Sequence, residues 1–247
     1  MTHAGTIAEL TAIVSRAAAV ILALDPTKVG RRAKPDGSPV SAADEAAEAV
    51  IIEGLSRVLP GLPVVSEEAV AREQPSELGR SFALVDPLDG TREFLAGSDE
   101  FTVNVAIVVD ARPRLGIIAA PALGLIWRGV VSAGAERLRL SPGSRLDEVG
   151  EIASIRTRRR PADGLAAMIS RSHFDAGTAA FLDGLPITSR VACGSSLKFC
   201  RIAEGAQTSM CGWGRLRNGM WLRGTQLSSQ PAVWCWGRTA LHCPTVA

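Results

Sequence analysis

The chain lacks several features that would assign it to a membrane or a secreted class. No apolar run approaches the ~20 residues of a membrane-spanning helix, and residues 1–10 lack the charged start and long apolar centre of a signal peptide. The five cysteines are odd in number and show no metal-ligand spacing, which favours reduced thiols in a cytoplasm. We therefore predict a cytoplasmic chain without a transmembrane segment.

Strong charge of either sign is also missing. The net charge of +2 gives no global attraction to a nucleic-acid polymer or to a membrane. The basic run at 156–160 favours a solvated loop over a phosphate or nucleic-acid patch. No internal repeat is apparent. With 247 residues, 47% of them apolar, the chain is long enough for one large domain or two tightly packed halves, and we expect Cys193 and Cys200 in the core.

Acidic residues, in contrast, gather where predicted strands and helices begin or end. Residues 82–85 form an apolar run typical of a buried strand, and turn-forming Asp-Pro and Asp-Gly pairs follow it. The proline fixes the direction of the chain, and Gly90 permits backbone angles that a β-carbon forbids. Asp86 and Asp89 would thus leave the end of a strand through a rigid turn, next to the Thr91 hydroxyl. Taken alone, this pattern favours a solvated hairpin turn over a cation site.

Two further acidic segments change that interpretation. A second apolar run, 62–65, ends at Ser66-Glu67-Glu68, and a Gly/Pro turn leads through Ser41 into a predicted helix that carries Asp44 in its first turn. Ser41 and Asp44 have the spacing of a capping box, so Asp44 has a structural explanation beside a catalytic one. Three acidic clusters at the boundaries of regular elements are what a multi-metal phosphoryl-transfer site needs, because Mg²⁺ prefers oxygen ligands.

Together, and in this order, the three segments resemble the inositol monophosphatase superfamily of magnesium-dependent phosphomonoesterases. The resemblance rests on Pro39-Val40-Ser41-x-Ala43-Asp44, Glu67-Glu68 and Asp86-Pro87-Leu88-Asp89-Gly90-Thr91-x-x-Phe94, and it covers roughly residues 5–205. It implies an α/β fold, with an α+β first half and an α/β second half, layered as the αβαβα sandwich of the sugar-phosphatase type. We expect a metal-binding half at 1–140, the start of a substrate half at 141–205 and an aberrant tail at 206–247, which leaves the C-terminal part incomplete.

The resemblance also implies a role for each matching residue. Two or more Mg²⁺ ions would be held by Glu67, Asp86, Asp89 and the backbone carbonyl of Leu88. The attacking water would be oriented and activated by Asp44 and Thr91, with Glu67 as a third catalytic group. The substrate would contact Glu67, Leu88, Asp89, Gly90 and Thr91.

Two stretches of the second half are similar to one branch of the superfamily. Ser170-Arg171-Ser172-His173 and residues 194–205 resemble the bacterial 3'(2'),5'-bisphosphate nucleotidases of sulfur metabolism. The branch implies removal of the 3'-phosphate from adenosine 3',5'-bisphosphate, with Ser195 and Ser196 in contact with the substrate. Taken alone, His173 fits a surface position and the two serines fit helix caps. In the same branch a loop that carries Lys34 and Asp36 would lie near the metals, and a solvated loop is the equal alternative.

The remaining patterns predict the regular elements. Helical spacing of apolar residues indicates a helix at 7–24, and antiparallel strands are expected at 101–109, 115–120 and 124–131. Residues 141–161 have the composition of a surface connection. A strand at 166–170 and a helix at 174–182 follow, and a Gly-Ser turn at 194–196 would open a last helix whose N–H groups suit an anion.

The tail does not match the rest of the chain. After Glu204 there is no Asp or Glu, whereas four of the five Trp residues lie beyond residue 206. The resemblance implies a further metal-binding Asp here, in a Trp-Asp pair, and it is absent. Codons for 218–224, read from the third base, can encode Trp-Asp-Val-Ala-Ala-Gly. The same shift can encode Ala-Asp-Val-Tyr through 206–210 and Asp-Gly-Thr-Pro-Leu through 238–243. We infer a reading-frame shift near Gly205, with a divergent tail as the alternative.

Three functions therefore stay open at the level of the sequence. The first is the bisphosphate nucleotidase, the second is the same chemistry on an inositol phosphate or related sugar phosphate, and the third is an inactive, truncated relic. Both active alternatives take a small phosphorylated substrate. The resemblance is also compatible with a homodimer and with a peripheral position at the inner membrane.

Overall fold

The computed structural model describes residues 3–33, 39–68, 79–131, 133–159, 162–172 and 174–206, with the short strands β12 (Ser209–Met210), β13 (Arg215–Leu216) and β14 (Met220–Trp221). The expectations for Lys34, Asp36 and His173 lie outside the described residues. So does most of the predicted tail, 206–247.

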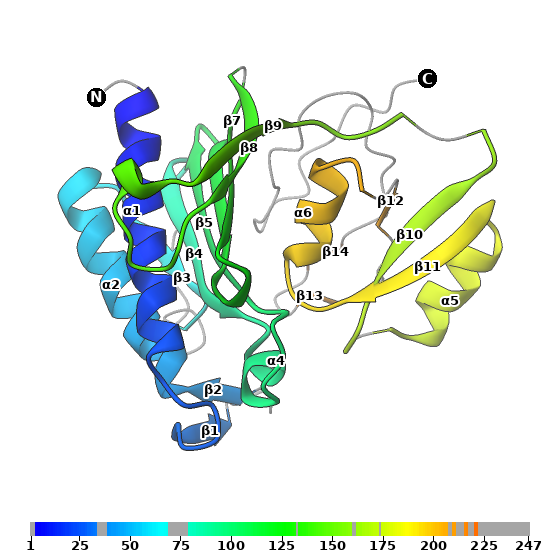
Figure 1. Ribbon diagram of the computed structural model, residues 1–247, viewed down its shortest axis with the longest axis horizontal. Helices are drawn as coiled ribbons and strands as arrows, with labels where there is room; N and C mark the ends of the chain where they lie inside the picture. Colours follow the sequence, from blue (N-terminus) through cyan, green and yellow to red (C-terminus); the bar gives the residue numbers. More distant parts are fainter. Residues whose placement is uncertain are drawn as a thin grey trace.

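A seven-stranded sheet forms the centre of the molecule (Figure 1). Its order along the sheet is β3 (Val64–Ser66), β4 (Phe82–Asp89), β5 (Thr102–Val109), β6 (Arg112–Ala120), β7 (Leu125–Val130), β8 (Gly134–Arg139) and β9 (Glu151–Ile155). β3 and β4 are parallel, and every later neighbour is antiparallel. The antiparallel pairing predicted for the three strands between 101 and 131 is thus confirmed. Tight turns join these strands, and such turns favour antiparallel neighbours.

The sheet continues beyond the expected end of the first half at residue 140. We expected 141–161 to be a surface connection, but β9 lies within it and pairs with β8. The sequence of β9 gives little sign of this because the strand is at the sheet edge, where Ile152 is 57% exposed. Its formation depends on backbone hydrogen bonds to β8 rather than on a buried apolar face.

Two helices cover one face of the sheet (Figure 1). α1 (His3–Leu22) and α2 (Ala42–Val58) pack on each other and on β4 to β7. By length and composition, Gly5–Leu22 could cross a membrane, which the sequence analysis did not expect. Here it is a core helix, since Leu10, Val14 and Ile21 are fully buried in the same apolar cluster as the sheet. α2 begins at Ser41 with the predicted capping box, in which Asp44 is the N3 residue.

The opposite face of the sheet packs on the second half. α6 (Leu197–Ala203) shares an apolar cluster with β6, β7 and β10 (Leu165–Ser170), and both Cys193 and Cys200 are buried in it, as predicted. A second sheet has the order β11 (Ile187–Cys193), β10, β12, with parallel pairing. α5 (Ala176–Asp183) covers its outer face through Leu182.

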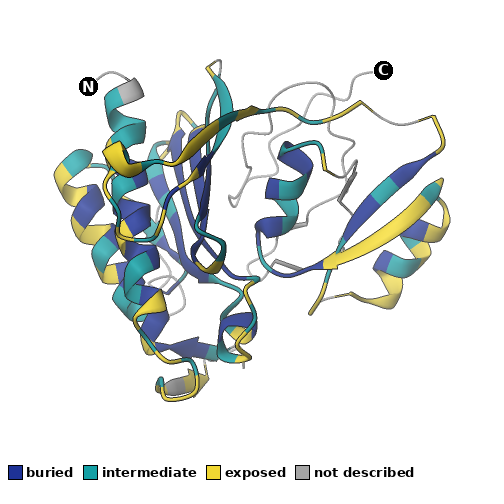
Figure 2. Ribbon diagram, in the orientation of Figure 1, coloured by how far each residue is buried: buried dark blue, intermediate teal, exposed yellow. Residues whose placement is uncertain are grey.

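The elements therefore form the αβαβα layering that was expected, from α1 and α2 through the central sheet, α6 and the second sheet to α5 (Figure 1). Figure 2 shows the burial that accompanies it: β5 and most of β4 and β6 in the central sheet are buried, whereas β9 and much of β11 are exposed. The halves meet mainly through α6, because the helix is packed between the two sheets.

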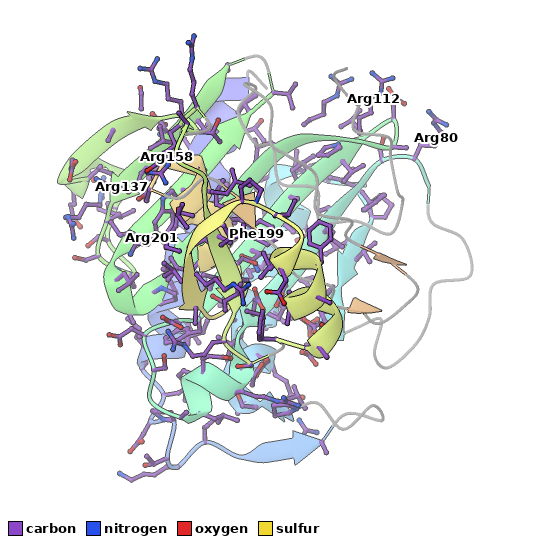
Figure 3. The ribbon with its side chains drawn as sticks, turned by 90° about the vertical axis from the view of Figure 1, so that its right-hand side faces the viewer. Arg80, Arg112, Arg137, Arg158, Phe199 and Arg201 are labelled. Atoms are coloured by element: carbon purple, nitrogen blue, oxygen red, sulfur yellow. The ribbon has the colours of Figure 1, made fainter. Side chains whose placement is uncertain are left out.

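The C-terminal end of α6 is held to the central sheet by Glu204. Its carboxylate accepts a hydrogen bond from the Trp127 indole and forms ion pairs with Arg137 and Arg201. In Figure 3, Arg137 and Arg201 lie together with Arg158 on one side of Phe199. Glu204 thereby ties α6 to β7 and β8.

Candidate metal centre

β4 carries Asp86, Leu88 and Asp89 to the edge of the site through a bulge. We expected this strand to end at residue 85, but β4 continues to Asp89. Asp86 lies opposite Asn104 and Asp89 opposite Thr102, so β4 has one residue more than β5 between these pairs. Pro87 has no N–H to donate to the ladder, which is why a bulge forms there. The Leu88 N–H instead donates to Asp86 Oδ1 at 3.2 Å.

The next residue, Gly90, turns the chain into α4 (Thr91–Leu95). Its φ of 92° lies in the left-handed region that favours glycine. A β-carbon at this position would come within 3.0 Å of the Glu100 carbonyl oxygen and 3.2 Å of Ser195 Cβ. Gly90 therefore permits both the turn and the close approach of the second half.

Thr91 joins α4 to the first turn of α2. Its hydroxyl lies 3.0 Å from Asp44 Oδ1 and 3.1 Å from the carbonyl oxygen of Leu88, both of which are acceptors. Asp44 Oδ2 accepts from the backbone N–H and the hydroxyl of Ser41, at 2.8 and 2.7 Å. The capping and catalytic explanations of Asp44 are thus compatible, because each oxygen of the carboxylate has its own partner.

Glu67, after β3, completes a group of acidic side chains. The pKa of Asp86 is raised well above its ordinary value, first by burial and then by the charges of Glu67, Asp89 and Asp44. Asp86 and Glu67 also share a hydrogen bond. The structure therefore places Glu67 beside the two β4 carboxylates, and Asp44 within their electrostatic reach.

Asp89 has a more balanced environment. Burial raises its pKa and so does the charge of Glu67, while a hydrogen bond from Ser196 and the charge of Lys198 oppose the shift. Lys198 is held by the carbonyl oxygens of Cys193 and Ser195. The local charge is negative, because the carboxylates of Asp44, Glu67, Asp86 and Asp89 outnumber the Lys198 ammonium.

The donors of this site are carboxylate and carbonyl oxygens, which suit a hard cation such as Mg²⁺. Within the described ranges, no three His, Cys, Asp or Glu side chains already enclose one metal position. The carboxylates are close enough to raise the pKa of Asp86 by repulsion, and a divalent cation would relieve that repulsion. The residues therefore fit a magnesium site by donor chemistry and by charge.

The second half contributes the turn before α6. Ser196 is the N-cap residue of α6, with φ −71° and ψ −3°, but its side chain makes no capping hydrogen bond. Its hydroxyl donates to Asp89 Oδ2 at 2.6 Å. Ser195 has a φ of 46°, and its side chain accepts from the Leu197 N–H at 3.4 Å. Both predicted serines thus lie at the junction of the halves, beside Gly90 and Asp89.

Glu100 and Asn104 at this junction were not predicted from the sequence, and Arg171 was noted only as part of the stretch Ser170-Arg171-Ser172-His173. Glu100 receives two hydrogen bonds of 2.7 Å from the Arg171 guanidinium and one of 2.7 Å from the Gly194 N–H. Asn104 donates to Ser196 Oγ at 3.1 Å. Asn104 could have been noticed as a lone amide within the apolar run 101–109. Glu100 has ordinary sequence surroundings, and only the fold brings it together with Arg171.

The inositol monophosphatase family model matches residues 5–215. A 3'(2'),5'-bisphosphate nucleotidase CysQ of Shigella flexneri is 38% identical over 172 residues, which are 70% of this chain and 65% of that protein. The chain thus spans just under two thirds of this curated relative.

Solved structures agree with this similarity. CysQ from Bacteroides thetaiotaomicron, a bacterial member of the inositol monophosphatase family, superposes with a TM-score of 0.67 at 26% identity and covers 85% of this chain and 80% of that one. The suhB protein of Bartonella henselae has the same fold, with a TM-score of 0.66 at 19% identity over 83% of this chain and 77% of that one.

Proposed function

Because this chain belongs to the inositol monophosphatase family, we propose that it is a magnesium-dependent phosphomonoesterase that removes the 3'-phosphate of adenosine 3',5'-bisphosphate to leave AMP and phosphate. The observation that carries the proposal is the convergence of Glu67, Asp86, Asp89 and Asp44 from three separate elements. The names of the nucleotidase relatives support the choice of substrate.

The proposed site divides into a cation-holding part and a water-orienting part. Glu67, Asp86, Asp89 and the Leu88 carbonyl would hold Mg²⁺, which polarises a phosphoryl group and stabilises its leaving oxygen. Thr91 contacts both Asp44 and the Leu88 carbonyl, so its hydroxyl stands between the two parts. Asp44 would take a proton from the attacking water through the oxygen that the capping box leaves to Thr91.

The remaining proposed contacts concern the substrate. Gly90 and Thr91 are at the start of α4, and their backbone N–H groups would donate hydrogen bonds to phosphate oxygens. Ser195 and Ser196 lie on the opposite side of the same junction. Because this part of the site is formed by both halves, a substrate would be bound between 1–140 and 141–205. We further propose that the enzyme works on a small soluble phosphomonoester in the cytoplasm.

The test is phosphate release from a panel of adenosine 3',5'-bisphosphate, inositol monophosphate and a sugar phosphate, with and without Mg²⁺. The proposal expects the bisphosphate to have the highest kcat/KM, with turnover lost on chelation. Preference for inositol monophosphate would support the alternative that the family name suggests. Asp89→Asn removes a proposed ligand and serves as the control for a contaminating phosphatase. If this variant releases phosphate as fast as the wild type, the activity does not come from this site.

A further inference from the structure

A short chain of hydrogen bonds runs from the interior of β5 to Asp89. Asn104 Nδ2 donates to Ser196 Oγ at 3.1 Å, and Ser196 Oγ donates to Asp89 Oδ2 at 2.6 Å. Its first two members are shielded from solvent, since Ser196 is 3% and Asn104 is 9% exposed, whereas Asp89 is half-buried. A hydroxyl has a single proton. Because Asn104 approaches Ser196 as a donor, that proton is directed to Asp89.

The position of Asn104 makes it an unusual choice for a strand residue. It lies opposite Asp86 in the β4–β5 pairing, between the buried Val103 and Val105. Its Oδ1 atom is buried without a hydrogen-bond partner among the described residues. An unsatisfied buried amide oxygen costs about 1–3 kcal/mol. An apolar side chain would avoid this cost, so the contribution of the amide lies in what its NH₂ group does.

We propose that Asn104 is a positioning residue that, through the Ser196 hydroxyl, orients the Asp89 carboxylate for cation binding. The inference rests on the proposed function, because it concerns one of the proposed Mg²⁺ ligands. Ser196 holds the Asp89 carboxylate through its hydroxyl, which donates to Oδ2, and also through its backbone N–H. The same contacts join the turn before α6 to β4 and β5, so the substrate half and the acidic side chains are positioned by one network.

The test measures binding of Mn²⁺, a paramagnetic substitute for Mg²⁺, to the full chain without substrate, from the electron paramagnetic resonance signal of the free ion. Asn104→Leu keeps the size of the side chain but removes the donor, and Ser196→Ala removes the hydroxyl. We expect each to weaken Mn²⁺ binding about tenfold, as is usual for residues that orient a metal ligand. The double variant should bind Mn²⁺ no more weakly than either single variant, because the two residues act through the same series of hydrogen bonds.

Thr102→Val is the matched control. Thr102 is the other buried residue of β5 whose side-chain oxygen has no partner among the described residues, and it lies opposite Asp89. Its hydroxyl is not part of the Asn104–Ser196–Asp89 hydrogen-bond series, so the variant should bind Mn²⁺ with wild-type affinity. Equal weakening by Thr102→Val and Asn104→Leu would show a general effect of changing β5 and would overturn the inference.

The failures of the two proposals are distinguishable. Wild-type Mn²⁺ affinity in Asn104→Leu, or effects that multiply to about a hundredfold in the double variant, would overturn the positioning role and leave the proposed function intact. A wild-type chain that binds no Mn²⁺ would overturn both. Nuclear magnetic resonance then still tests the contact itself: the Asn104 side-chain NH₂ should exchange slowly in the wild type and at least tenfold faster in Ser196→Ala.

Discussion

Asp44 belongs to the capping box of α2 and also contacts a residue of the proposed site. From the sequence alone, Asp44 could be a helix cap or a catalytic group. In the structure, Oδ2 completes the capping box with Ser41, while Oδ1 lies 3.0 Å from the Thr91 hydroxyl. A residue with two equivalent oxygens does not have to choose, and the cap fixes the orientation that the proposed chemistry needs.

Thr91→Val tests the catalytic part of this arrangement. Valine has the shape of threonine but no hydroxyl, so the contacts to Asp44 and to the Leu88 carbonyl are lost while packing is kept. We expect kcat to fall about 10²- to 10⁴-fold, the usual contribution of a positioned proton-transfer group. The melting temperature should change little. Thr91→Ser, which keeps the hydroxyl, should retain most of the activity, and an equally inactive serine variant would contradict the role of the hydroxyl.

Asp86 is the acidic residue with the highest electrostatic penalty in the described site. Its folded pKa is raised above the ordinary 3.8. Over the pH range between these two values the folded chain keeps a proton that the unfolded chain has lost. The stability of the cation-free protein should therefore fall as pH rises through that range, by about 1.4 kcal/mol for each unit of the shift.

Asp86→Asn removes the charge and the penalty together. In EDTA at pH 7 we expect the variant to melt at a higher temperature than the wild type, with a difference that shrinks on acidification towards pH 4. Mg²⁺ should raise the melting temperature of the wild type but not that of the variant, and the variant should be inactive. Asp183→Asn is the control, because Asp183 is an exposed helix residue paired with Arg190. A variant that melts below the wild type in EDTA at pH 7 would contradict the predicted repulsion.

At the scale of elements, the bulge of β4 and the turn at Gly90 bring the acidic residues and the second half together. Gly90→Ala would place a β-carbon within 3.0 Å of the Glu100 carbonyl oxygen. Gly97→Ala is a matched control, since Gly97 also has a positive φ, of 72°, but nothing lies within 4 Å of its virtual β-carbon.

Both glycine variants carry the cost of a left-handed residue, about 1 kcal/mol. We expect Gly90→Ala to lose a further 1–3 kcal/mol of unfolding free energy, in the range of overpacking, and to lose activity, because the turn before α6 is displaced. Chemical denaturation and phosphate release measure the two effects. Equal unfolding free energies for the two variants would show that the close approach of the halves contributes nothing.

A second link between elements is the Glu100 carboxylate, which connects the ends of β10 and β11 to the start of β5 through Arg171 and Gly194. Arg171 holds the pKa of Glu100 below its ordinary value of 4.5. The interaction thus contributes stability above that pH, and the contribution is lost as pH falls through the lowered pKa.

Glu100→Gln should raise KM about fivefold, because the ion pair with Arg171 places the substrate half. The corresponding loss of binding free energy is only about 1 kcal/mol, because solvent screens a half-exposed ion pair. Mn²⁺ binding should be unchanged, since Glu100 is not a proposed ligand. Arg190→Gln breaks an exposed pair on β11 in the same sheet and should leave KM as it is. A fall in kcat at constant KM in Glu100→Gln would argue against a role in placing the substrate half.

At the scale of the whole molecule, the described residues contain most of the layers but not the acidic residue expected from the tail. We propose that residues after about 205 are read out of frame. A chain translated in the shifted frame from this point should have at least tenfold higher Mg²⁺-dependent turnover than the printed chain, because it regains an aspartate in a Trp-Asp pair. Equal turnover of the two chains would remove the reason for the proposal, and so would codons that cannot yield the motif.

Local patterns predicted much of the fold and of the candidate site. The capping box of α2 and the three antiparallel strands between 101 and 131 follow from signals within a few residues of sequence. The prediction for Asp44, Glu67, Asp86 and Asp89 needed three separated segments and their resemblance to a known family. Edge strand β9 was missed because its side chains are largely exposed. The end of β4 was placed too early because a bulge can carry a proline that a regular ladder cannot.

The sequence by itself determined the acidic clusters, their order, and the turns that present them, since each is specified by neighbouring residues. Tertiary structure decided which distant groups meet. Asn104, Glu100 and Arg171 gain their partners only when α6 packs between the two sheets, and Ser196, the N-cap residue of α6, meets Asp89 for the same reason. Contacts between residues some 70 to 110 positions apart leave no local pattern, because their geometry depends on the packing of the whole chain.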